Sequence, residues 1–130
     1  MHTFAFNHLA LAVKDVSESM TFYQQIFDFK EIENTASKSK TRWLSIGEGK
    51  ELHIIPRPQA SIKTVKAVHI AFSTKEFHAF QSHLKSLNIS YFDWSGTPNT
   101  FNVRDDGIQQ LYFQDPNSYW IEVNDAPGEK

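Results

Sequence analysis

The chain has 130 residues, of which 40% are apolar and 22% are charged, so it has the length and composition of one ordinary soluble domain. Thirteen basic and fifteen acidic side chains give a formal net charge of -2, so there is no excess of positive charge to hold a nucleic-acid backbone. The sequence contains no cysteine, which excludes disulfides, thiolate metal sites and cysteine nucleophiles.

No apolar run approaches the roughly 20 residues that a membrane-spanning helix needs, and the first residues lack a signal-peptide pattern. We therefore expect a cytoplasmic protein with no membrane partner and no nucleic-acid partner. The chain is rich in aromatic residues, with 11 Phe, 4 Tyr and 3 Trp. This supply is sufficient for a core and for the wall of a pocket that binds a small-molecule substrate.

The first half of the chain begins with a short apolar run at residues 5–13, which predicts a strand. A helix is predicted to begin near Asp15 or Ser17, because apolar residues then recur at intervals of three and four. The apolar face of this helix consists of Val16, Met20, Tyr23 and Phe27. Three strand-like segments follow, at residues 29–34, 41–46 and 51–56.

The second half repeats this order. Residues 65–73 predict a strand, and the helix after it has an apolar face made of Phe77, Phe80, Leu84 and Leu87. Three strand-like segments follow, at residues 89–94, 110–114 and 118–123. The stretch 57–64 contains a proline and no strong periodicity, so we expect it to be a linker. Each half is therefore predicted to be strand, helix, strand, strand, strand.

Like residues of the two halves align, as expected for a duplicated fold. His8 aligns with His69 near the start of each half, and Trp43 aligns with Tyr112 near the end. The sequence separation of the aligned residues is 61 for the first pair and 69 for the second, which predicts an insertion of eight residues in the second half. We expect a long loop at residues 95–107, which are rich in turn-forming residues.

Four residues with metal-binding side chains occupy repeat-related positions in the predicted strands. Alternation along the first strand places Ala10 and Ala12 on the same face as the histidine, and such small neighbours leave room for a ligand. The four residues are His8, His53, His69 and Glu122.

The four side chains together predict a divalent metal site. A single strand histidine is more often a hydrogen-bonded structural residue, but four candidates at matched positions favour a shared cation. A buried carboxylate is costly unless it is paired, and a cation would pair it. Three nitrogen donors and one carboxylate suit Zn, Ni, Fe or Co better than Mg or Ca.

Three segments of the chain, residues 7–13, 22–29 and 112–123, resemble the glyoxalase, bleomycin-resistance and extradiol-dioxygenase superfamily, also called vicinal oxygen chelate. The resemblance implies an α+β fold in which two βαβββ modules, at about residues 4–58 and 64–125, form an open, barrel-like mixed sheet with helices outside. The modules would make one domain over residues 1–130. The resemblance also implies a homodimer, often with sites built from two subunits.

In this superfamily, the usual metal positions match His8, His69 and Glu122 of this chain. Glu122 would then be both a metal ligand and the group that moves a substrate proton. His53 occupies a fourth position where glyoxalase I commonly has Glu or Gln. Glu51 lies two residues away on the same strand face, so it is the alternative fourth ligand.

The resemblance implies a metal-dependent lyase or isomerase similar to glyoxalase I (lactoylglutathione lyase), acting on a substrate that chelates the metal through vicinal oxygens. An extradiol dioxygenase, with a facial triad for Fe(II), is one alternative. A metal-free drug-binding protein of the bleomycin-resistance type, with Trp94 among its stacking surfaces, is another. The candidate substrate-binding residues are Arg42, Trp43, Tyr112 and Trp120.

Overall fold

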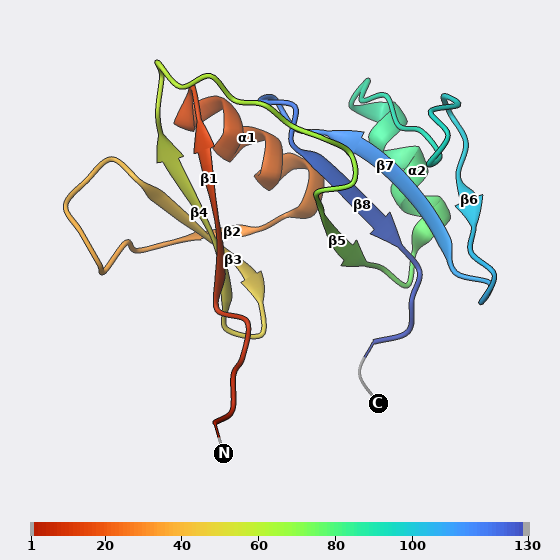
Figure 1. The fold of residues 1–130 in the computed structure, drawn as a ribbon, viewed down its shortest axis with the longest axis horizontal. Coiled ribbons are helices and arrows are strands. Elements are labelled where there is room, and N and C mark those ends of the chain that lie inside the picture. The colour runs from red at the N-terminus through yellow and green to blue at the C-terminus, as the bar shows by residue number, and fades with distance from the viewer. Residues whose placement is uncertain (1, 129–130) are drawn as a thin grey trace. The chain divides into compact units, whose positions relative to one another are not determined.

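The protein is described by a computed structural model over residues 2–128, and its chain divides into two compact units, Met1–Ile62 and Lys63–Lys130. The division falls within the stretch 57–64 that was expected to be a linker. Each unit contains one helix and one four-stranded mixed sheet (Figure 1). This confirms the predicted α+β class with two βαβββ modules, whereas the assembly of both modules into one domain stays a prediction.

The first unit contains β1 (His8–Val13), α1 (Val16–Phe27), β2 (Lys30–Ile32), β3 (Arg42–Gly47) and β4 (Lys50–Pro56). Its sheet has the strand order β1-β4-β3-β2, with β1 parallel to β4 and the other pairs antiparallel. The second unit contains β5 (His69–Ser73), α2 (Phe77–Ser86), β6 (Asn102–Val103), β7 (Gln109–Gln114) and β8 (Trp120–Asn124). Its strand order, β5-β8-β7-β6, repeats that of the first unit with the same directions.

The strand register is also repeated between the units. In the first sheet, His53 pairs with Ala10 on one side and Trp43 on the other. In the second sheet, Glu122 pairs with Ala71 and Tyr112 in the same way. His53 and Glu122 therefore occupy equivalent positions of the two sheets.

Each sheet has one face that is buried against its helix. The buried side chains of the first sheet alternate along the strands and include Leu44, Leu52 and Ile54, and α1 packs over β3 and β4. In the second unit, Phe80 of α2 contacts Phe113 of β7, with ring centroids 6.0 Å apart. Within residues 2–128, no helix is long and apolar enough to span a membrane.

The start of α1 is set by Asp15, whose side chain accepts a hydrogen bond of 3.1 Å from the backbone N–H of Glu18. This bond satisfies one of the donors that a helix leaves free at its N-terminus. We predict that Asp15→Ala lowers the free energy of unfolding by about 1 kcal/mol. Urea denaturation followed by circular dichroism measures this change. Asp15→Asn keeps an acceptor, so a loss as large as that in Asp15→Ala would contradict the capping role.

The prediction of a strand at residues 89–94 was wrong. Only Phe92 pairs there, in isolated bridges with Tyr112 and Pro98, while β6 lies within the stretch 95–107 that was expected to be a loop. Polar side chains cause the difference. Asp93 accepts a hydrogen bond from the N–H of Thr97 and turns the chain away after one paired residue. Such turns have no hydrophobic periodicity that would reveal them in the sequence.

Candidate metal centre

The face of the second sheet opposite Phe113 and α2 carries the polar residues. Strand alternation and register place His69, Glu122 and Tyr112 on this face, while their chain neighbours, such as Ile121, form the core on the other face. Ala71 lies beside Glu122 in the register, so the smallest side chain of the group adjoins the carboxylate.

Glu122 is a buried carboxylate, with only 4% of its surface exposed. Its Oε2 accepts hydrogen bonds from the amides of Gln110, at 3.0 Å, and Asn124, at 2.7 Å. Burial alone raises the pKa of Glu122, but hydrogen bonds from Asn124, Gln110 and Tyr112 outweigh burial and hold the pKa below its usual value. The carboxylate is therefore charged at neutral pH.

Tyr112 is affected in the opposite direction by the same carboxylate. Burial and the hydrogen bond to Glu122 raise the pKa of the Tyr112 hydroxyl far above its usual value. Tyr112 is therefore a neutral hydrogen-bond donor to Glu122 rather than a base.

The imidazole of His69 has a defined tautomer. Its Nδ1 lies 2.9 Å from the backbone carbonyl oxygen of Lys66, and a carbonyl only accepts, so Nδ1 carries a proton. In the neutral ring, Nε2 then has a free lone pair. This Nε2 lies 3.2 Å from Oε1 of Glu122. Two lone pairs facing each other repel, so a proton or a cation between them is required for a favourable contact.

The spacing of these two atoms fits a shared metal ion. Bonds of about 2.0 to 2.1 Å from a cation to nitrogen and oxygen separate the two ligand atoms by about 2.8 to 3.4 Å, from the octahedral to the tetrahedral angle. The observed 3.2 Å lies within this range. The hydrogen bond from Nδ1 of His69 to a carbonyl is also the outer contact typical of metal-binding histidines. The two residues thus fit a divalent metal.

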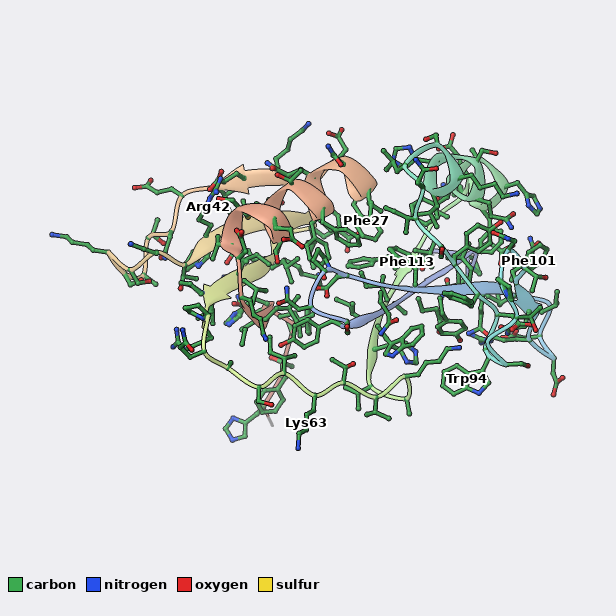
Figure 2. The ribbon with its side chains drawn as sticks, turned by 90° about the horizontal axis from the view of Figure 1, so that it is seen from above. Phe27, Arg42, Lys63, Trp94, Phe101 and Phe113 are labelled. Atoms are coloured by element: carbon green, nitrogen blue, oxygen red, sulfur yellow. The ribbon has the colours of Figure 1, made fainter. Side chains whose placement is uncertain are left out.

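An aromatic cluster lies beside this pair. The indole of Trp94, labelled in Figure 2, is 48% exposed. It packs against the ring of Tyr112, with centroids 5.2 Å apart. The ammonium nitrogen of Lys66 lies 5.3, 5.1 and 5.0 Å from the ring centroids of Trp94, Tyr112 and Trp120. Trp120 is the register partner of His69, so the cluster adjoins the candidate metal ligands.

The first unit brings the other two candidate ligands together. The rings of His8 and His53 are stacked with centroids 4.0 Å apart, and Trp43 stacks with His53 at 4.1 Å. Nε2 of His53 lies 2.9 Å from Oε1 of Glu51, so this nitrogen donates to the carboxylate. The register aligns His53, rather than Glu51, with Glu122 of the second sheet. The choice of fourth ligand between these two residues stays a prediction.

Arg42 lies elsewhere on the first sheet. It is adjacent to Trp43 along β3, so strand alternation places it on the opposite face from Trp43 and His53. Its guanidinium donates to both oxygens of Glu31, at 2.8 and 2.7 Å. This pairing lowers the pKa of Glu31 and raises that of Arg42. Both side chains are partly exposed, so the pair contributes little to stability.

The four predicted metal ligands are thus found as two pairs, His8 with His53 in the first unit and His69 with Glu122 in the second. Across residues 2–128, no group of three or more His, Cys, Asp or Glu side chains is arranged to hold a metal ion. Sequence reasoning missed Lys66, Gln110 and Asn124. The two amides share the strand face of Tyr112 and Glu122, so alternation was the available signal for them.

Comparison with known proteins identifies the superfamily of this chain. Residues 5–123 match the model of the Glyoxalase/Bleomycin resistance protein/Dioxygenase superfamily, and the chain belongs to this superfamily. The chain is similar to Glyoxylase I 4 of Arabidopsis thaliana, with 30% identity over 95% of this chain and 71% of that protein. It is also similar to the fosfomycin resistance protein FosX of Listeria innocua, with 26% identity over 91% of this chain and 86% of that protein.

A solved structure has the same fold. A variant of FosX from Listeria monocytogenes, complexed with Mn(II) and 1S,2S-dihydroxypropylphosphonic acid, matches with a TM-score of 0.76 and 24% identity, over 98% of this chain and 95% of that chain. The resemblance predicted from the sequence is thereby confirmed at the level of family and fold. The relatives include enzymes, and one of the related structures contains a divalent metal.

Proposed function

We propose that this protein is a metal-dependent lyase or isomerase of the glyoxalase I type, acting on a small substrate with vicinal oxygens. The observation that carries the proposal is the contact of 3.2 Å between Nε2 of His69 and Oε1 of Glu122. In the neutral imidazole Nε2 has a free lone pair, and the carboxylate is charged, so a divalent cation would satisfy both. The similarity to Glyoxylase I 4 and to FosX supports this class of chemistry.

The metal would be held in the second unit by His69 and Glu122, and the sequence prediction adds His8 and His53 of the first unit. A bound divalent cation supplies Lewis-acid stabilisation of negative charge that develops on a neighbouring substrate oxygen. The donor set suits Zn, Ni, Fe or Co, and the related Mn(II) complex adds manganese to the candidates. The homodimer and the cytoplasmic location stay predictions.

Glu122 is the proposed proton-transfer group. Its Oε2 is held by two amides, so Oε1 is the oxygen that would loosen from the proposed metal and move a substrate proton between adjacent carbons. The low pKa of Glu122 keeps the carboxylate deprotonated at neutral pH. Trp43, Tyr112 and Trp120 stay the proposed substrate contacts. Arg42 is left out, since it lies on the opposite face from Trp43 and is paired with Glu31.

The test is a substrate panel on protein that has been stripped of metal and reloaded with Mn, Ni, Zn, Co or Fe(II). The panel contains methylglyoxal with thiols, catechols and fosfomycin. We expect turnover of methylglyoxal with a thiol only after reloading, and a loss of at least about 100-fold in kcat/KM for Glu122→Gln. His78→Ala, an exposed histidine of α2, is the matched control and should retain activity. Cleavage of catechols alone would support a dioxygenase instead, and metal-independent drug binding would contradict the proposed enzyme.

A further inference from the structure

The side chain of Lys66 is held in a fixed position. Its ammonium donates to the backbone carbonyl oxygens of Asp93, at 2.9 Å, and Trp94, at 2.8 Å. Its nitrogen also lies within about 5 Å of three ring centroids, those of Trp94, Tyr112 and Trp120. A flexible lysine side chain therefore has one defined location in the second unit.

The charge of this ammonium is not paired with a carboxylate of the described residues. No ion pair within residues 2–128 involves Lys66, and the charge of Asp93 acts on it only from a greater distance. An ammonium has three N–H donors, and the structure provides two acceptors for it among the described residues. Among the described residues, one N–H donor has no acceptor and the positive charge has no carboxylate in ion-pair contact. Partial burial strengthens any such contact, because water screens it less.

The position of Lys66 connects it to the candidate metal centre. Tyr112 contacts Lys66 with its ring and hydrogen-bonds Glu122 with its hydroxyl. The carbonyl of Lys66 also accepts the Nδ1 proton of His69. An anion at the ammonium would therefore lie on the same sheet face as the His69 and Glu122 pair, next to the exposed ring of Trp94.

We infer that Lys66 is a specificity-determining residue that binds an anionic group, such as a carboxylate or a phosphonate, of a ligand whose flat or apolar part packs on Trp94. The inference deepens the proposed function, because it concerns the ligand of the same site. It assigns the substrate to small organic anions. Lys66 contributes the charge, Trp94 contributes the apolar surface, and the proposed metal would contact other oxygens of the ligand.

The test uses benzoate, a flat anion, and benzyl alcohol, which has a similar shape without the charge. Both are titrated into the full chain in the presence of a chelator, and binding is followed by the NMR signals of the indole N–H groups of Trp94 and Trp120. We expect benzoate to bind at least tenfold more tightly than benzyl alcohol, with a preference that decreases as salt is added. Equal binding of the two compounds, or no binding of benzoate, would overturn the inference.

Variants separate charge recognition from a structural role. Lys66→Met should weaken benzoate binding at least tenfold and abolish the preference over benzyl alcohol, while Lys66→Arg should stay within about threefold of the wild type. Lys63→Met is the matched control: Lys63 is exposed, its side chain extends away from the chain in Figure 2, and its loss removes the same charge. Equal weakening by Lys63→Met and Lys66→Met would overturn the inference.

The outcome is independent of metal binding. If Lys66→Met fails to fold, the benzoate and benzyl alcohol comparison in the wild type still decides the question. Because the titrations contain a chelator, selective benzoate binding without any metal affinity would contradict the proposed enzyme and leave the role of Lys66 intact. Metal binding without selective benzoate binding would contradict the role of Lys66 and leave the proposed enzyme intact.

Discussion

Replacing Glu122 with Ala is expected to weaken the binding of Mn(II) or Zn(II) by at least about 100-fold. Loss of an outer hydrogen-bond partner of a metal ligand costs about 10- to 100-fold in affinity, and loss of a ligand costs at least as much. Glu122 would contribute a charged oxygen 3.2 Å from Nε2 of His69. Isothermal titration calorimetry on metal-stripped protein, with elemental analysis of the purified variants, measures the effect.

Two further variants make this prediction specific. Asn124→Leu removes one amide donor from Oε2 of Glu122, so it should weaken metal binding by about 10-fold, less than the loss of Glu122 itself. His78→Ala should bind metal as the wild type does. If Glu122→Ala keeps the wild-type metal affinity while it remains folded, Glu122 is not a ligand.

The second large effect concerns the core of the second unit. Phe113 is completely buried in β7 and contacts Phe80 of α2. Truncation of a buried Phe to Ala removes apolar contacts and leaves a cavity, so Phe113→Ala should lower the free energy of unfolding by about 3 to 5 kcal/mol. A domain of this size is stable by roughly 5 to 15 kcal/mol in total, so the variant should be close to unfolding at 37 °C.

Urea denaturation, monitored by tryptophan fluorescence and by circular dichroism, gives the two free energies of unfolding. Val103→Ala in β6 is the control, because Val103 is 60% exposed and its truncation should change the free energy by about 0.5 kcal/mol or less. A cost below about 1 kcal/mol for Phe113→Ala would show that this position is not part of a closely packed core.

Much of the fold could be predicted from the sequence because local periodicity determines it. The helix at Val16–Phe27 begins where its capping residue and apolar spacing indicate. The alignment of His53 with Glu122 is repeated in the strand register of the two sheets. Periodicity did not reveal β6, since the turn after Phe92 is closed by side-chain hydrogen bonds such as that of Asp93.

The surroundings of the candidate site were harder to predict. Lys66 precedes its strand, and its ring partners come from positions 94, 112 and 120, so only the folded chain brings them together. The location of Arg42, by contrast, follows from alternation, because its neighbour Trp43 occupies the other face. The tautomer of His69 depends on the carbonyl of Lys66, which no sequence pattern encodes.

The most direct test of the account is a crystal structure of the metal-loaded protein in which anomalous scattering identifies the cation. We predict one divalent cation at about 2.0 to 2.2 Å from both Nε2 of His69 and Oε1 of Glu122. The hydrogen bond from Nδ1 of His69 to Lys66 should persist. A cation bound elsewhere, or a protonated His69 paired directly with Glu122 at saturating metal, would contradict the account.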